Sequence, residues 1–534
     1  MERDKYVLAI DLGTGGPKTA LVSMRGVVAG HELIPVETRH LPDGGVVQDP
    51  REWWAAITSS ARRLLGSGIV PAADVVAVAC TGQWGSTIPV DEGGELAGDC
   101  VLWMDNRGEP YSAKVVGGPL QVGGYAPLKA WRWIRKSGGA PSPLGNDPTG
   151  HILYLRHEQP DVYARTAFFL EPVDYLNLKF TGRIAGTPAS MVISWLTDNR
   201  DLTSARYDPE LLKLSTLDPA RLPPLQPASS VIGTVLPEVA RDLGLPDGVQ
   251  VVAGTPDLHS AAIGSGAIAD YEPHMAISTT AWLSCHVPFK RTDATRQIAT
   301  IPSVMPGRYL LANNHETAGV CLQWLRDNVI VQDDGLLAGA TATDGYRAYD
   351  ALAASVPAGA GGAIFTPWLA GERCPVDDRN VRAAFYNLSL RTTRAHMVRA
   401  VFEGVAFNAR WMLEAVEKFV RRPLSAIRFI GGGAASDVWC QIHADVLDRP
   451  VHRVAEPLLA NVRGAALFAG LVLGDLQPSQ ISALARIDAT FEPDPATRAV
   501  YDELYREYPG LYHRQRKMYA RLNGRSRKTA PART

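Results

Sequence analysis

Short apolar runs that end at turns mark the beginning of the chain. Residues 6–10 form a continuous apolar run that is typical of a buried strand; it stops at a glycine-rich stretch, 13–16, and an apolar pattern resumes over 19–23. This arrangement predicts a hairpin with a tight turn. Residues 51–65 carry apolar positions at helical spacing, with Asp49 as the expected N-cap and Pro50 at the first helical position. A further buried strand is predicted over 75–80.

The opening pattern returns in the second half of the chain. A strand predicted over 249–253 ends at Gly254-Thr255-Pro256-Asp257 and precedes a helix rich in small residues, and then a strand, a turn and a second strand over 275–287 repeat the arrangement of residues 7–22. A repeat at this separation indicates two related α/β lobes that face each other across a cleft. We expect a first domain over 1–265 and a second over 266–515, the second with a helix over 394–420 and a strand over 426–430.

Two segments fall outside this pattern. Residues 115–145 are rich in glycine and proline and predict an inserted surface loop. Within it, residues 129–136 combine Trp131, Trp133 and four cations, a composition that could also contact a membrane surface or nucleic acid, although a solvated loop with anchoring aromatic side chains is favoured. The basic end of the chain, 516–534, is expected to be a disordered tail.

Composition narrows the class of ligand. The 534 residues carry 54 Lys+Arg against 55 Asp+Glu, a net charge of -1 that gives no field to attract nucleic acid or acidic lipid. We therefore expect a small-molecule substrate and neither a nucleic-acid nor a membrane partner. The six cysteines show no paired spacing, and the start of the chain lacks an export signal, so a reducing cytoplasm is the expected location.

Three turns place small residues directly after predicted strands, where backbone N–H groups could approach a phosphate closely. One such turn alone is more often structural, but three of them together with two carboxylates at strand ends favour a phosphate site. The candidate phosphate-binding or nucleotide-binding residues are Gly13, Thr14, Lys18, Thr279, Thr280, Gly432, Gly433, Ala434 and Ser436.

The two carboxylates suit different tasks. Asp11 stands where a strand meets the first turn, a position suited to holding Mg²⁺, although capping the turn is the alternative. Asp257 follows a strand and precedes a helix, so it is the candidate general base, and an N-cap role is equally compatible with its position. The stretch ending at Lys18 looks like a Walker-type loop, but the spacing fails because Pro17 precedes the lysine.

Other kinds of site are disfavoured. Cys440, His443 and His452 could be imagined as metal ligands, but the first two are helix neighbours flanked by apolar residues, so packing in a core is favoured over a metal site. The sequence contains no Gly-x-Ser-x-Gly motif, which argues against an α/β-hydrolase.

The chain resembles the FGGY carbohydrate kinases, and most of all their xylulokinase branch. The resemblance runs from Ile10 to about Tyr512 and rests on the following stretches: Asp11-Leu12-Gly13-Thr14, Gln48-Asp49-Pro50, Gly82-Gln83, Trp103 to Arg107, Asp174-Tyr175-Leu176, Gly254 to Asp257, Gly371 to Pro375, and Gly431 to Ala434. It implies two actin/hexokinase-like (ribonuclease H-like) domains that close on ATP·Mg²⁺ and a sugar or polyol. A homodimer is one assembly that it allows.

Carried over residue by residue, the resemblance assigns the catalytic base to Asp257 and the magnesium-linked carboxylate to Asp11. It assigns substrate contacts to Gln83, Trp84 and Asp105. The chain departs from the family where xylulokinases have Gly-Gln-Met-His-Gly, because residues 82–86 lack the histidine, and Thr279 replaces a glycine. We expect ATP-dependent phosphorylation of a ketose or polyol; the alternative is a degenerate relative that senses sugar or nucleotide without turnover.

Overall fold

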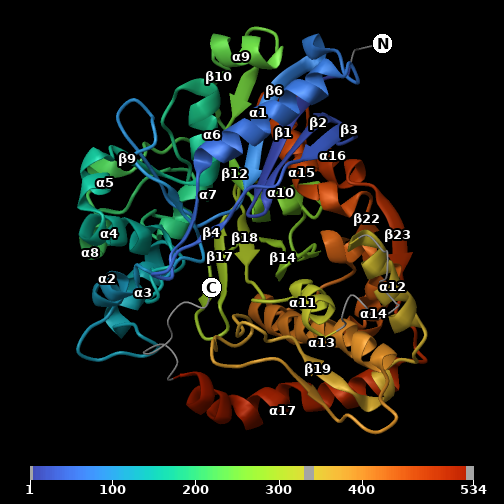
Figure 1. Cartoon of the computed structure of the whole chain (residues 1–534). Coiled ribbons are helices and arrows are strands. Elements are labelled where there is room, and N and C mark those ends of the chain that lie inside the picture. Colours follow the sequence, from blue (N-terminus) through green and yellow to red (C-terminus); the bar gives the residue numbers. More distant parts are fainter. Residues whose placement is uncertain (1–3, 330–341, 525–534) are drawn as a thin grey trace.

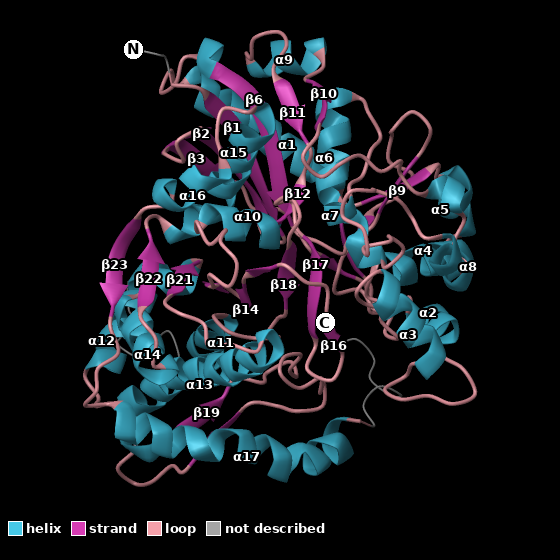
Figure 2. Cartoon of the chain, turned by 180° about the vertical axis from the view of Figure 1, so that it is seen from behind, coloured by secondary structure: helices cyan, strands magenta, loops and turns pink. Residues whose placement is uncertain are grey.

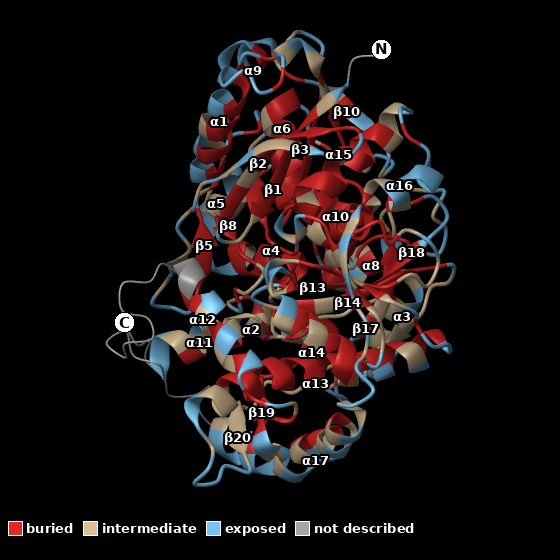
Figure 3. Ribbon diagram, turned by 90° about the vertical axis from the view of Figure 1, so that its right-hand side faces the viewer, coloured by how far each residue is buried: buried red, intermediate tan, exposed pale blue. Residues whose placement is uncertain are grey.

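The computed structural model describes residues 4–329 and 342–524. The chain forms two lobes, each built around a β-sheet with helices on both faces. In Figure 1 the first half of the chain makes the upper lobe and most of the second half makes the lower one. Figure 3 shows that buried residues concentrate in the two sheets and in the helices that cover them.

The sheet of the first lobe contains the predicted hairpin and the strand that follows. Its order is β10-β11-β6-β1-β2-β3, with β12 pairing the end of β6; β1 and β6 are parallel, and β1 and β2 are antiparallel. The strands are β1 (Tyr6–Gly13), β2 (Gly16–Ser23), β3 (Val28–Leu33), β6 (Val75–Gly82), β10 (Val231–Thr234), β11 (Gln250–Val252) and β12 (Thr255–Pro256). The predicted helix α1 (Pro50–Gly66) covers one face, and the Asp49 side chain caps it by accepting from Arg51 N at 2.9 Å.

The sheet of the second lobe repeats this design. Its order is β14-β13-β21-β22-β23, in which β13, β21 and β22 are parallel and β13 and β14 form an antiparallel hairpin. The strands are β13 (His274–Ile277), β14 (Ala281–Ser284), β21 (Ile427–Ile430), β22 (Val451–Val454) and β23 (Ile487–Phe491). The predicted helix is present as α13 (Arg394–Val420) and packs with α14 (Asp437–Leu447) on the outer face. The expected duplication is therefore confirmed.

Two helices cross between the sheets, and each covers the sheet of the other half. Helix α15 (Ala460–Leu473) lies against the first sheet, where Val462, Ala465 and Ala466 share a core with strand residues such as Val7 and Ala9. Helix α10 (Asp257–Gly264) comes from the first half, and its Ala261 packs against the second sheet. Figure 1 shows the orange α15 among the blue strands of the first sheet.

The crossing of α10 and α15 depends on glycine. A Cβ placed on Gly264 would lie 1.8 Å from the carbonyl oxygen of Ala460, and one placed on Gly464 would lie 1.9 Å from the carbonyl oxygen of Ser260. Because no side-chain carbon fits at such a distance, only glycine allows the two helix backbones to approach this closely. Two elements from opposite halves of the chain are thus held in direct backbone contact.

Smaller elements complete the lobes. The minor sheets are built from β4 (Arg39–His40), β5 (Val46–Gln48) and β8 (Cys100–Val101); β7 (Ile88–Val90) and β9 (Phe168–Leu170); β15 (His286–Val287), β16 (Thr292–Asp293), β17 (Ile298–Pro302) and β18 (Tyr309–Ala312); and β19 (Ile364–Thr366) and β20 (Ala384–Tyr386). The remaining helices are α2 (Glu109–Val116), α3 (Pro127–Lys136), α4 (Pro148–Glu158), α5 (Pro160–Arg165), α6 (Pro172–Thr181), α7 (Pro188–Met191), α8 (Pro209–Ser215), α9 (Pro237–Leu243), α11 (Val320–Asn328), α12 (Ala342–Ala354), α16 (Pro478–Leu484) and α17 (Arg498–Asn523). Figure 2 shows α17 along the base of the second lobe.

The insertion over 115–145 is not the loop that its glycine and proline content predicts, because residues 127–136 form α3. Trp133 on this helix is fully buried in a hydrophobic cluster of the first lobe. Its cations have partners within the chain: Lys129 Nζ donates to the carbonyl oxygens of Val115 and Gly117 at 2.7 and 2.8 Å, and Lys136 Nζ lies 2.7 Å from an Asp208 carboxylate oxygen. Proline at the first helical position and amphipathic spacing outweigh the flanking glycines.

The tail expected from residue 516 begins later than predicted. Helix α17 continues to Asn523, with Tyr519 buried against the second lobe's core, and Asn523 Nδ2 donates to Asn380 O at 2.7 Å. An aromatic residue at helical spacing keeps this basic stretch attached. Residues 525–534 lie outside the described part of the chain.

All six cysteines are free thiols and buried. Cys440 and His443 pack in the second core as expected, and the described residues contain no cluster of metal-ligating side chains. Within residues 4–329 and 342–524, no helix combines the length and apolar character needed to cross a bilayer.

Candidate active site

A cleft of about 1420 Å³ opens between the lobes and brings most of the predicted site residues together. Both halves of the chain contribute to its walls. The predicted residues that line it are Asp11, Gly13, Thr14, Lys18, Gln83, Trp84, Asp257, Thr279, Thr280 and Gly432.

The first turn joins β1 and β2 and forms part of the cleft floor. Gly16 has a φ of +137°, and a Cβ there would lie 2.1 Å from the carbonyl oxygen of Ile34, so only glycine allows this bend. A Cβ on Gly15 would meet no other atom within 4 Å. Glycine at this open position leaves the backbone accessible, which fits the close approach of a phosphate.

The second and third turns end two neighbouring strands of the second sheet. Thr279, between β13 and β14, is exposed, and its carbonyl oxygen accepts from Ala318 N at 2.9 Å. Gly432 follows β21 and lines the cleft, and a Cβ on the preceding Gly431 would lie 2.6 Å from the carbonyl oxygen of Ile277. Because β13 and β21 are adjacent and parallel, both turns open at the same edge of the sheet.

Three residues predicted to contact nucleotide support the third turn without lining the cleft. Gly433 packs on Ile277, since a Cβ there would lie 2.5 Å from its Cγ2 atom, and Ala434 is fully buried. The Ser436 hydroxyl caps α14 by accepting from Trp439 N at 3.0 Å and donates to Asp350 at 2.7 Å. These three residues shape the turn and are not among the residues that line the cleft.

Asp105 lies outside the cleft, contrary to its expected contact with substrate. Its side chain is fully buried; its carboxylate accepts from Val46 N at 2.8 Å and from the guanidinium of Arg107 at 2.8 Å. Asp105 therefore fixes the loop after β8 to β5 through an ion pair. Its position in a motif indicated importance but could not distinguish a substrate contact from a structural pair.

Asp11 lies near the end of β1, and the positive charge of Lys18 only partly balances its negative charge. Lys18 Nζ is 3.7 Å from its Oδ2 atom and donates to the carbonyl oxygen of Leu458 at 2.7 Å. Burial raises the pKa of Asp11, and the charge of Lys18 offsets this in part. A largely buried carboxylate beside open glycine turns fits a divalent cation, because an added positive charge would restore its ionised form.

Asp257 is the first residue of α10 and faces the cleft. Its Oδ1 atom accepts from Leu258 N at 2.7 Å. Burial, followed by the negative charge of Asp11, raises the pKa of Asp257 to about 7. A carboxyl group with such a pKa is ionised in a large fraction of molecules at neutral pH and is still basic enough to accept a proton from an alcohol.

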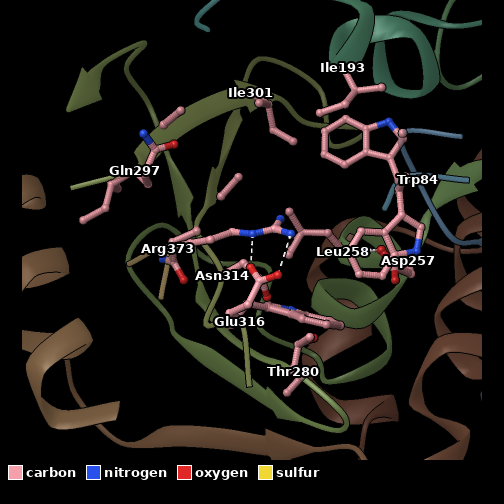
Figure 4. Close-up of a pocket in the computed structure, with 18 of the residues that line it drawn as sticks. Trp84, Ile193, Asp257, Leu258, Thr280, Gln297, Ile301, Asn314, Glu316 and Arg373 are labelled. Atoms are coloured by element: carbon pink, nitrogen blue, oxygen red, sulfur yellow. Dashed lines mark hydrogen bonds and ion pairs between the residues drawn. The ribbon is translucent and has the colours of Figure 1, made fainter. Parts of the chain in front are cut away.

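The loop after β6 forms the wall next to Asp257. Gln83 is held between Thr14 and Gln48, with polar atoms 3.3 and 3.2 Å apart, respectively. The indole N–H of Trp84 donates to the carbonyl oxygen of Ser190 at 2.8 Å, which turns the ring into the cleft (Figure 4). Gly85 has a φ of +82°, a conformation that disfavours the histidine expected at this position.

Sequence reasoning missed two contributions from the second half. Arg373 and Glu316 form an ion pair that faces the cleft (Figure 4), and the guanidinium lies 5.7 Å from the ring centroid of Trp103 in the first half. Asn461, at the start of α15, has its side-chain amide 3.5 Å from Asp11. Arg373 belongs to a motif noted in the sequence, whereas no local signal marks Asn461, which reaches the site only because α15 crosses to the first sheet.

Comparison with known proteins accounts for this arrangement. Residues 6–264 match the N-terminal domain, and residues 275–473 the C-terminal domain, of the FGGY family of carbohydrate kinases. The chain belongs to this family. It is therefore a carbohydrate kinase, a phosphotransferase with an alcohol group as acceptor, of the actin/hexokinase-like fold. Kinases of this family use ATP and a divalent metal, and the glycine turns and Asp11 fit both.

Relatives with different names match nearly the whole kinase. A "Xylulose kinase" from Staphylococcus epidermidis is 26% identical over 524 residues, covering 97% of this chain and 98% of the relative. A "Gluconokinase" from Bacillus subtilis is 25% identical over 466 residues, covering 87% and 86%. The crystal structure of xylulose kinase from Rhodospirillum rubrum has a TM-score of 0.79 and 26% identity, covering 96% of this chain and 100% of that one.

Proposed function

We propose that this FGGY kinase transfers the γ-phosphoryl group of ATP to a hydroxyl of a small ketose or polyol, with Asp257 as general base. The observation that carries the proposal is the position of Asp257, at the start of α10 in the cleft lined by the phosphate-type turns, with its pKa raised to about 7. Its carboxylate takes the hydroxyl proton as the new O–P bond forms.

The other residues hold the reactants. The backbone at Gly13, Thr14, Thr279 and Thr280 would bind phosphate oxygens, and the turn at Gly432 would contact the nucleotide. Mg²⁺, when bound, supplies positive charge to the phosphates, and Asp11 would hold it. Gln83 and Trp84 form the wall for the acceptor. Closure of the lobes excludes water, which would otherwise compete for the phosphoryl group.

A panel of acceptors tests this function. Purified enzyme with ATP and Mg²⁺ should release ADP with one or more ketoses or polyols at a rate well above the rate without acceptor. The alternative, a sensor that binds ligand without turnover, has support in the replacements at Gly85 and Thr279. It predicts ligand binding by calorimetry and no acceptor-dependent ADP release, a result that would contradict the proposal.

The pH dependence of the rate should follow the ionisation of Asp257. Because the base is inactive when protonated, kcat/KM should rise about tenfold per pH unit below the pKa of about 7 and level off above it. Initial rates between pH 5 and 9 in buffers of constant ionic strength check this. A profile that is flat from pH 5 to 7, or that falls with rising pH in this range, would argue against Asp257 as the base.

Three expectations stay predictions. A cytoplasmic location agrees with six free thiols, and a homodimer is an assembly to be tested by light scattering. The domain boundary at residue 265 is a further proposal.

A further inference from the structure

The acceptor end of the cleft has an apolar wall. Trp84, Ile193, Leu258 and Ile301 gather beside Asp257 (Figure 4). Leu258 and Ile301 belong to one packed cluster, and Trp84 packs against it. Ile193 extends this wall next to the loop after β6, because a Cβ placed on Gly85 would lie 3.5 Å from its Cγ1 atom. Trp84 and Ile193 thus present hydrocarbon to the acceptor, over a packed layer that contains Leu258 and Ile301, which are 7% and 1% exposed.

Several polar atoms near this wall have partners within the chain, whereas the buried indole N–H of Trp282, which packs against the same cluster, has no partner among the described residues. The Trp84 indole N–H donates to Ser190 O, and the Trp103 indole N–H donates to the Thr14 hydroxyl at 3.2 Å. Both ends of the Gln83 amide contact other side chains. A hydroxyl group placed against this part of the described chain would give up its bonds to water with little in return, which is unfavourable.

The opposite side of the cleft is polar. Arg373 and Glu316 face the apolar wall across the space beside Asp257, and Asn314 and Gln297 lie on the same side (Figure 4). The Arg373 Nη2 and Glu316 Oε1 atoms are 3.3 Å apart. Guanidinium and carboxylate groups are strong partners for hydroxyls, so this side can bind the polar face of an acceptor.

We propose that the acceptor is an amphipathic alcohol, namely a polyol or ketose in which a deoxy or alkyl group replaces one hydroxyl. Its hydrocarbon part lies on Trp84 and Ile193, its hydroxyls face Arg373 and Glu316, and one hydroxyl meets Asp257. The inference rests on the proposed function and specifies its substrate class. Buried hydrocarbon gains free energy on this wall, whereas a hydroxyl at the same place loses hydrogen bonds.

Acceptors that differ by a single hydroxyl test the proposal. Suitable pairs are D-xylulose with 1-deoxy-D-xylulose, and glycerol with 1,2-propanediol. The deoxy member should have a kcat/KM about tenfold or more above that of its partner in at least one pair, the scale expected for a small apolar group in a fitted pocket. Equal values, or higher values for the fully hydroxylated member in every pair, would overturn the inference while leaving kinase activity intact.

Binding measurements test this inference independently of the proposed function, because they do not depend on turnover. If no acceptor gives ADP, calorimetry with the Asp257→Asn variant still measures the affinity for each member of the same pairs, and so tests whether the apolar wall favours the deoxy member. Tighter binding of the deoxy member supports the inference, and equal or weaker binding overturns it.

A variant of the wall provides a second test. Ile193→Thr places a hydroxyl on the apolar side at little change in size and should reduce the preference for the deoxy member about fivefold or more. Ile69→Thr is the matched control, since Ile69 is 55% exposed and does not line the cleft. An unchanged preference in Ile193→Thr, with normal thermal stability, would contradict the role of this wall.

Discussion

Replacing Asp257 by asparagine should lower kcat by roughly a hundredfold or more, because the amide cannot accept the proton of the attacking hydroxyl. Asparagine has nearly the same shape and can still accept from Leu258 N, so the start of α10 should keep its hydrogen bond. The KM for ATP should change little. Acceptor-dependent ADP release under saturating substrates measures the effect.

Asp147→Asn is the matched control. Asp147 also stands at the start of a helix, where it accepts from Gly150 N at 3.0 Å, and burial raises the pKa of its carboxyl to about 7. It does not line the cleft. Its replacement should leave kcat within about threefold, because asparagine keeps the helix cap and the residue lies outside the cleft; the lost hydrogen bond from Ser142 N should lower the melting temperature instead. Near-normal turnover in Asp257→Asn, or an equal loss in both variants, would remove the role assigned to Asp257.

Replacing Gly264 by alanine should destabilise the folded chain by about 3 kcal/mol, at the upper end for overpacking, because the new methyl would lie 1.8 Å from the Ala460 carbonyl oxygen. The clash is with backbone, so a rotamer change cannot relieve it. The two helices must separate, which also displaces Asp257 on α10 and Asn461 on α15. We therefore expect a lower melting temperature together with reduced kcat.

Gly66→Ala provides the comparison for this substitution. Gly66 ends α1, and a Cβ there would meet no other atom within 4 Å. Alanine at Gly66 should therefore leave the melting temperature unchanged or raise it slightly, through its better helix propensity. If Gly264→Ala melts at the wild-type temperature, the close crossing of α10 and α15 is not essential to the fold.

Local patterns predicted the parts of the site that lie on single segments. The hairpin around Gly13, its repeat around Thr279 and the strand leading to Gly432 each place small residues after an apolar run, and this pattern depends only on residues near in sequence. Asp11 and Asp257 could be singled out because each follows such a run. All of them line one cleft.

Contacts between distant segments were beyond this kind of reasoning. Nothing near Asn461 indicates that α15 belongs to the first sheet, and nothing near Arg373 indicates that it meets Trp103 across the cleft. Asp105 was expected to contact substrate because it belongs to a motif shared with the family, but its carboxylate forms an internal ion pair with Arg107. In α3, local glycine content was misleading because the buried ring of Trp133 stabilises the helix through tertiary packing.

The exchange of helices between the halves also affects the order in which the protein can fold during translation. Strands β1, β2 and β6 leave the ribosome early, but one face of their sheet remains bare until α15 is synthesised, more than three-quarters of the way along the chain. Valine and alanine side chains on that face stay accessible to other nascent chains and to chaperones during this interval. Assembly of the upper lobe must therefore wait until translation is nearly finished.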